Sequence, residues 1–364
     1  AKDEYDENAQ NKKNAEKKAK KLADEGMGVY KLDMNKCILE RYISANYQSY
    51  NEMNGDNIND VFVDESKRIW LANYPTGITV IDYRYENYHW MKHSMGNKQS
   101  IVNDQVHAVI EDSDGDLWFG TSNGISLYNS GTGEWHSFLS SFNHQLKDKN
   151  HIFITLCEVS PGIIWAGGYT SGIYKINKAD LSVEYFSPYL LSHINMRPDK
   201  YIRDMIKDSK GHIWSGGYYN LKCFDLATNS VRLYPGVSSI TAIAEKDSHN
   251  MWIGTAMGLY LLNRDSGKYE YIKLEAGSTY INTLYQADNG LLYVGTNGAG
   301  VFIYDAQNKK FEHYIAKNSA LVSNSIFTIL PEVDGRIMMS TENGVTSYYP
   351  AEKLFHNWTK DQGL

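Results

Sequence analysis

The segment Asp112-Ser-Asp-Gly-Asp116 has the acidic spacing with which many calcium-binding loops begin. A complete loop of that kind needs a bidentate Glu at its twelfth position, where this chain has Asn123. The segment lies between two short apolar runs, where such residues also favour a tight turn. We therefore interpret it as a hairpin turn and expect no metal site.

The 11 histidines and the many carboxylates do not form a recognised catalytic motif. The sequence contains no H-E-x-x-H, no G-x-S-x-G and no phosphate-binding G-x-x-x-x-G-K. The three cysteines, Cys37, Cys157 and Cys223, lie far apart and make neither a zinc motif nor a disulfide framework. We expect no catalytic residue, no cofactor and no enzymatic activity.

Several tyrosines occur in short segments that are typical of turns, namely Tyr74, Tyr169, Tyr218 and Tyr219. An exposed aromatic ring can stack on the apolar face of a sugar, and nearby Asn, Arg and Asp side chains can bind its hydroxyl groups. These segments are candidates for carbohydrate binding if the fold brings them together. The alternative is that the rings pack on neighbouring loops or on a partner.

An internal repeat determines where these residues lie. Its clearest copy is IVNDQVHAVIEDSDGDLWFGTSNGISLYN, residues 101–129. An alternating apolar run is followed by a turn, an aromatic anchor, a small residue and a second apolar run that begins with Gly. The anchor recurs about every 45 residues, at Trp70, Trp118, Trp165, Trp214, Trp252, Tyr293 and, in degenerate form, Met338.

Each copy predicts four short strands, which in the clearest copy cover residues 105–112, 116–121, 124–129 and 134–139. A unit of this length with four strands has the size of one β-propeller blade. We expect the anchor to fill the space between adjacent blades. The small residue after it should let the sheets approach each other.

The seven copies predict an all-β fold, a seven-bladed β-propeller of four-stranded antiparallel blades over residues 46–364. Residues 28–45 predict an extra strand pair, which either helps to close the ring or remains from a preceding blade. An eight-bladed ring is the alternative. Residues 1–27 are rich in Lys, Glu and Ala and predict a short, charged helical extension.

The repeated phrase, V-x-x-I-x-x-D-x-x-G-x-[LI]-W-[FI]-G-T-x-x-G-[IL], resembles the two-component regulator propeller repeat. Residues 106–129 match it closely, and the copies at Trp252 and Tyr293 match it well. The copies at Trp165 and Trp214 have Gly in place of Thr. The resemblance extends over residues 28–364. It implies the extracytoplasmic sensor region of a hybrid two-component system, in the periplasm or at the cell surface.

In a propeller, the turns between the second and third strands lie on the same rim as the connections into the first strands. That rim surrounds the mouth of the central channel, so the four tyrosines should gather there. Residues near the start of the first strands are polar where a structural strand could be apolar. Arg203 and Asp204 could orient a ligand or form a structural ion pair. The expected ligand-binding residues are Tyr74, His107, Tyr169, Arg203, Asp204, Tyr218, Tyr219 and Asn282.

The chain has 364 residues and a formal net charge of −7, without an apolar stretch long enough to cross a bilayer. An acidic chain lacks the basic stripe of a nucleic-acid binder, so we expect neither nucleic acid nor membrane contact. The favoured function is a non-catalytic sensor that binds an oligosaccharide and acts on a neighbouring propeller, a signalling domain or a second copy of itself. The alternatives are an interaction propeller of a surface or secretion assembly and, less favoured, a polysaccharide lyase or hydrolase.

Overall fold

The computed structural model describes residues 91–141, 150–186, 200–274, 280–332 and 335–359, together with the backbone of five strands nearer the N-terminus. Contacts divide the chain into two compact units, one of residues 1–89 and 361–364 and the other of residues 90–360. Within the described residues every regular element is a β-strand, which confirms the all-β prediction. The helix predicted over residues 1–27 lies outside the described residues.

The first unit contains two small antiparallel sheets. Strands β1 (Val29–Asp33) and β2 (Ile38–Ile43) form a pair. Strands β3 (Ile58–Val63), β4 (Ile69–Asn73) and β5 (Gly77–Ile81) form a three-stranded sheet in chain order. This second sheet contains the repeat whose anchor is Trp70.

The second unit consists of six sheets, each of four antiparallel strands in chain order. The first three blades are β6 (Val106–Glu111), β7 (Leu117–Thr121), β8 (Gly124–Tyr128), β9 (Trp135–Phe138); β10 (Phe153–Ser160), β11 (Ile163–Gly168), β12 (Ile173–Asn177), β13 (Ser182–Phe186); and β14 (Ile202–Lys207), β15 (Ile213–Gly217), β16 (Leu221–Asp225), β17 (Ser230–Tyr234). The last three are β18 (Ile240–Asp247), β19 (Asn250–Thr255), β20 (Gly258–Asn263), β21 (Lys268–Ile272); β22 (Ile281–Gln286), β23 (Leu291–Thr296), β24 (Val301–Asp305), β25 (Lys310–Tyr314); and β26 (Ile326–Pro331), β27 (Ile337–Thr341), β28 (Gly344–Tyr349), β29 (Leu354–Trp358).

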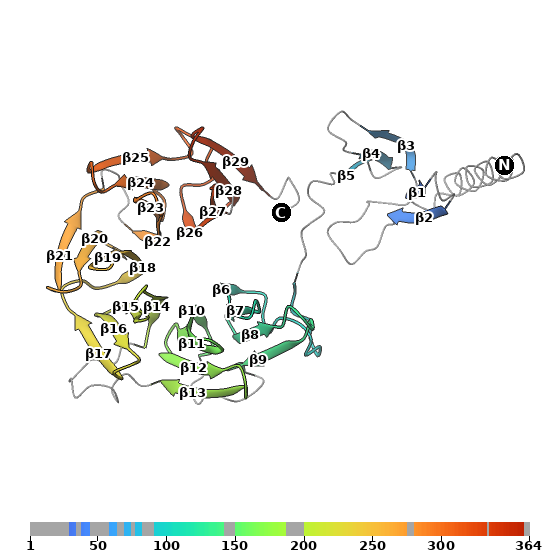
Figure 1. The fold of residues 1–364 in the computed structure, drawn as a ribbon. Helices are drawn as coiled ribbons and strands as arrows, with labels where there is room; N and C mark the ends of the chain where they lie inside the picture. Colours follow the sequence, from blue (N-terminus) through green and yellow to red (C-terminus); the bar gives the residue numbers. More distant parts are fainter. Residues whose placement is uncertain are drawn as a thin grey trace, which may run out of the picture. The chain divides into compact units, whose positions relative to one another are not determined.

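The first strands of the six blades lie nearest a common centre, and the fourth strands lie at the periphery (Figure 1). We call the first strands, β6, β10, β14, β18, β22 and β26, the inner strands. Each inner strand packs against that of the next blade, from β6 through to β26. The inner strands therefore surround the central channel of a propeller.

The propeller has six blades, so the prediction of a seven-bladed ring and the eight-bladed alternative are wrong. The repeat around Trp70 forms strands β3–β5 of the other unit, the three strands that the structure describes for this copy. A repeated phrase encodes the strands of a blade, because these depend on local alternation and turns. Membership of the ring depends on contacts with neighbouring blades, which the phrase does not specify.

The anchor residues lie between adjacent blades, as the sequence predicted. Trp118 packs with Phe153 and Ile164 of the following blade, and Trp214 packs with Ile240. The anchors of five blades are almost completely buried: Trp118, Trp165, Trp214, Trp252 and Tyr293. Burial of such large side chains at each contact is the main source of cohesion between the blades.

A glycine two residues after each of these anchors allows the next inner strand to approach closely. A Cβ atom on Gly216 would lie 2.4 Å from Cγ2 of Ile240, and one on Gly254 would lie 2.6 Å from Cγ2 of Ile281. In the last blade the equivalent residue is Ser340. The prediction that a small residue brings the sheets together is therefore confirmed for these blades.

The segment Asp112–Asp116 is a tight turn, closed by the Gly115 N–H donating to Asp112 O at 2.9 Å. Lys178 of the second blade places its Nζ atom 2.7 Å from Asp112 Oδ2 and 2.8 Å from carboxylate oxygens of both Asp114 and Asp116. The acidic residues that suggested a calcium loop thus surround an ammonium group of the chain itself. In the third blade, Asp208 accepts a hydrogen bond from Trp214 Nε1 and pairs with Arg264 of the fourth.

Candidate functional site

Every inner strand of the propeller carries a β-bulge at its second residue. A bulged residue has no partner in the ladder, and bulges redirect side chains at rims and next to binding sites. The bulged residues are His107, Ile154, Arg203, Thr241, Asn282 and Phe327. Three of the predicted ligand-binding residues therefore occupy one equivalent position in different blades.

Hydrogen bonds tie the turns of one blade to the connection that leads into the next inner strand. The Gly124 N–H donates to His151 O at 2.7 Å, and the Gly172 N–H donates to Lys200 O at 2.9 Å. Within the second blade, the Tyr169 N–H donates to Ile152 O at 2.9 Å. The turns and connections thus form one continuous rim near the start of the inner strands.

Three tyrosine rings lie in contact on this rim. Tyr169 meets Tyr201 edge to face with ring centroids 5.3 Å apart, and Tyr201 stacks on Tyr218 with centroids 4.2 Å apart. Tyr169 and Tyr218 are 43% and 51% exposed, while Tyr201 is half-buried. We call these three residues the aromatic shelf. Tyr219, at 41% exposed, follows directly in the chain.

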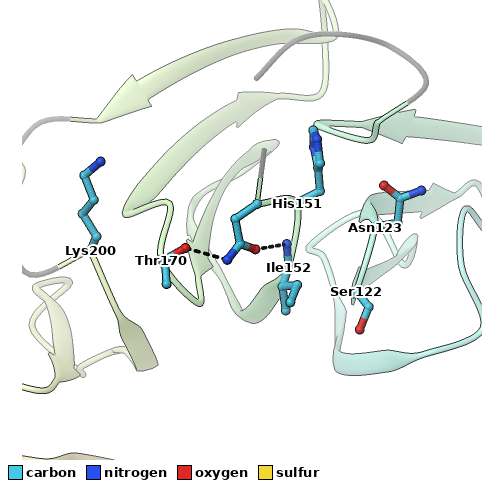
Figure 2. A pocket seen from close by; sticks show the side chains of 7 residues that line it. Ser122, Asn123, His151, Ile152, Thr170 and Lys200 are labelled. Atoms are coloured by element: carbon cyan, nitrogen blue, oxygen red, sulfur yellow. Dashed lines mark hydrogen bonds between the residues drawn. The ribbon is translucent and has the colours of Figure 1, made fainter. Parts of the chain in front are cut away.

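A cleft of about 660 Å³ lies on the same rim, between the first three blades. Figure 2 shows side chains from both turns and connections around it. Asn150 donates from Nδ2 to Thr170 Oγ1 and accepts the Ile152 N–H at 3.1 Å. The lining residues are Ser122, Asn123, Asn150, His151, Ile152, Thr170 and Lys200.

The cleft borders the aromatic shelf along the chain. Thr170 directly follows Tyr169, and Lys200 directly precedes Tyr201. Polar residues of the cleft are therefore immediate chain neighbours of aromatic residues of the shelf. This combination suits a ligand that has hydroxyl groups on its edges and apolar faces.

His107 and Arg203 act on each other through charge, although they belong to the first and third blades. Burial lowers the pKa of His107, and the nearby Arg203 guanidinium lowers it further. The Nε2 atom of His107 lies 2.7 Å from Ser122 Oγ. Because an ordinary His already titrates below pH 7, the ring is mostly neutral at pH 7.

Asp204 and Asn282 join neighbouring inner strands. Asp204 Oδ2 accepts the Ile243 N–H at 2.7 Å, and Asn282 Nδ2 donates to Ile326 O at 2.9 Å. Burial raises the pKa of Asp204, against the opposing effects of this hydrogen bond and of the Arg203 charge. Both side chains thus have a structural role between blades in this structure.

The structure brings together Tyr169 and Tyr218 from the set predicted from the sequence, and Tyr74 lies outside the described residues. Sequence reasoning missed Tyr201, Asn150 and Lys200. All three lie in the connections that lead into inner strands, whereas the predicted tyrosines lie in the turns between the second and third strands. Their position just before Phe153 and Ile202, the first residues of inner strands, is the signal that could have found them.

Six four-stranded antiparallel blades around a channel define the class of this protein, which is a β-propeller. Residues 100–123 match the family model "Two component regulator propeller". The chain therefore carries the repeat of that family, as its sequence indicated. No curated protein matches the chain.

Solved structures share the fold at low sequence identity. The extracellular domain of a hybrid two component system from B. thetaiotaomicron is similar at 19% identity and a TM-score of 0.57, over 84% of this chain and 39% of that one. A virginiamycin B lyase from Staphylococcus aureus is similar at 13% identity and a TM-score of 0.53, over 78% of this chain and 90% of the lyase. This chain thus spans about two fifths of the extracellular domain that it resembles. In the described residues, no helix has the length and apolar character of a membrane span.

Proposed function

We propose that this propeller is a non-catalytic, extracytoplasmic ligand-binding module of a two-component signalling protein, in the periplasm or at the cell surface. Its ligand is an oligosaccharide bound on the rim. The observation that carries this proposal is the aromatic shelf beside a polar cleft. The repeat family and the likeness to the extracellular domain of a hybrid two component system support the signalling context.

The site offers both kinds of contact that a sugar ring needs. Exposed faces of Tyr169 and Tyr218 can stack on the apolar face of a ring. Asn123, Asn150 and Thr170 supply amide and hydroxyl groups to the ring hydroxyls. The cleft volume of about 660 Å³ lies within the usual range for small-molecule sites, about 300–1,000 Å³.

Signalling requires the ligand to favour one arrangement of the protein over another. Residues of three blades line the cleft, so a bound oligosaccharide contacts several blades at once. We propose that occupancy changes the contacts of this rim with a neighbouring propeller, a signalling domain or a second copy of the chain.

The test is a thermal-shift screen against a panel of oligosaccharides, followed by calorimetry on each hit. A ligand that binds only the native state stabilises it by about 2.7 kcal/mol at a hundredfold excess over Kd. We expect at least one sugar to shift the transition, and we expect Tyr169→Ala and Tyr218→Ala each to reduce that shift by about half or more. A shift that neither substitution reduces would place the sugar elsewhere and overturn the proposed site.

A second candidate function is that of a protein-interaction propeller. It is favoured by exposed apolar side chains on the inner strands of the first and last blades, where Val109 and Leu330 are each 57% exposed and Phe327 is 51% exposed. Substituting Val109 and Leu330 by Ser would weaken such an association without affecting sugar binding. Likeness to a lyase rests on the fold, which alone does not favour catalysis.

A further inference from the structure

Basic side chains of the propeller gather on one sector of the rim, although the chain as a whole has a net charge of −7. Lys200 lines the cleft. Arg203 lies three residues after Lys200, on the bulge of β14, and its charge acts on both His107 and Tyr201. The second and third blades thus present positive charge next to the aromatic shelf.

The described residues that line the cleft include no carboxylate. Asp204 is the acidic residue next to Arg203, and its carboxylate accepts the N–H of Ile243 from the next blade. Burial raises the pKa of Asp204, whereas this hydrogen bond and the charge of Arg203 lower it.

Resting on the function proposed above, we infer that the oligosaccharide is acidic. A carboxylate or sulfate group of the sugar binds beside Arg203 at the channel mouth, while an adjacent ring stacks on the aromatic shelf. Uronates and sulfate esters share the feature that is recognised, a planar or trigonal set of anionic oxygens.

The geometry suits this division of roles. A guanidinium group binds carboxylate or sulfate oxygens through two parallel N–H donors, with charge assistance. Tyr201 connects the two parts, because its ring stacks on Tyr218 and its hydroxyl lies within the field of Arg203. When the anionic group of one sugar unit binds Arg203, the adjacent unit can therefore lie against the rings of Tyr201 and Tyr218.

The experiment is calorimetry of the full chain with matched pairs of ligands in which one member carries the anionic group and the other has it masked or removed. One pair is an oligogalacturonate and its methyl ester, and the other is a sulfated galactan oligosaccharide and its desulfated form. We expect the acidic member of one pair to bind about tenfold more tightly or better, equivalent to about 1.4 kcal/mol. The pair that shows the preference identifies the source of the anion, and added salt should reduce the preference.

Variants separate this inference from the proposed function. In Arg203→Gln, the affinities for the acidic and the neutral member of the pair should differ by no more than about twofold. Arg203→Lys should keep part of the preference for the acidic member, because it keeps the charge. Lys268→Gln, on the outer strand β21, is the matched control and should change nothing. A urea midpoint for each variant shows whether it remains folded.

If the acidic and neutral members bind equally well and Tyr218→Ala weakens the binding of both, the inference is overturned and the proposed function stands. Binding of no member of either pair, with no hit among other sugars, would overturn both. A preference for the acid that persists in folded Arg203→Gln would also overturn the assignment to Arg203.

Discussion

The ring of Tyr201 stacks on the ring of Tyr218 at a centroid distance of 4.2 Å and an interplanar angle of 24°. Tyr201 belongs to the connection that precedes β14, and Tyr218 belongs to the turn between β15 and β16 of the same blade. The stack holds the turn against the channel mouth and leaves half of Tyr218 exposed. A ring that is already fixed in place loses little freedom when a ligand binds, which favours affinity.

Tyr218→Ala should weaken oligosaccharide binding about tenfold. Loss of an aromatic stacking partner costs about 0.5–1.5 kcal/mol beyond the lost area, and the exposed Tyr218 supplies that partner. Calorimetry measures the change. Tyr271→Ala is the control, since Tyr271 is 47% exposed and also contacts a tyrosine ring but lies on β21. Equal losses in the two variants would argue against the shelf.

Gly216→Ala should destabilise the propeller by about 1–3 kcal/mol, the usual cost of forcing an extra carbon into a packed core. The new Cβ atom would lie 2.4 Å from Cγ2 of Ile240, so the third and fourth blades must move apart. Urea unfolding followed by tryptophan fluorescence checks this. Ser340→Ala at the equivalent place in the last blade should change stability little, and a loss as large as that of Gly216→Ala would contradict the explanation.

Lys178→Gln should lower stability by about 3 kcal/mol, because it leaves the buried carboxylate of Asp112 without its cation. Burial alone would lower the pKa of Lys178, but hydrogen bonds to Asp112, Asp114 and Asp116 outweigh it and raise the pKa. Lys353→Gln is the matched control. Its Nζ is also 2.7 Å from a carboxylate, that of Glu312, but the pair is exposed and should matter little. Equal decreases in the urea midpoint of the two variants would contradict the prediction.

Stability should fall as the pH is lowered from about 4. Burial opposes the shift, but hydrogen bonds from Lys178 and Trp118 lower the pKa of Asp112, and those from Trp214, His212 and Arg264 lower that of Asp208. A depressed folded-state pKa contributes stability above the unfolded value, about 3.9, and that stability is lost as the pH falls through the folded-state pKa. Urea midpoints between pH 7 and pH 3 test this, and Asp208→Asn should flatten the acid limb.

Affinity for an acidic oligosaccharide should increase as the pH falls into the range in which His107 becomes protonated. The pKa of His107 is lowered by burial and by Arg203, so a bound anion that faces Arg203, His107 and the hydroxyl of Ser122 favours the protonated ring. Binding should therefore take up a proton, which calorimetry detects as a dependence of the heat on the buffer. His107→Gln should remove this dependence, and the uncharged ligand of the pair should never show it. A buffer-independent heat for the wild-type chain would contradict the role of His107.

Much of the blade structure could be predicted from the sequence, because alternation and turn residues act locally. Residues 116–121 and 124–129 were expected to be strands, and the structure has Leu117–Thr121 and Gly124–Tyr128. The buried place of Trp118 between blades followed from its recurrence. The number of blades in the ring did not follow, since that number depends on contacts between sheets.

The candidate site was accessible to sequence reasoning only in part. Tyr169 and Tyr218 could be found because they lie in turns that the repeat defines. Tyr201 lies outside the repeated phrase, in a connection that has no common pattern. The contact of Lys178 with Asp112 joins residues of different blades, and local spacing cannot show which cation fills an acidic turn.

Because the second residue of each inner strand is bulged, the pairing of the strand does not depend on which residue occupies that position. Ile154, Arg203 and Phe327 differ in size and charge, yet the register shift is the same in their three blades. Exchange of a side chain at this position therefore leaves the pairing of the inner strand within its own blade undisturbed. The bulged residues of the channel mouth can thus be exchanged to alter specificity without a change in strand register, although Asn282 also bonds to the next inner strand and His107 also responds to the charge of Arg203.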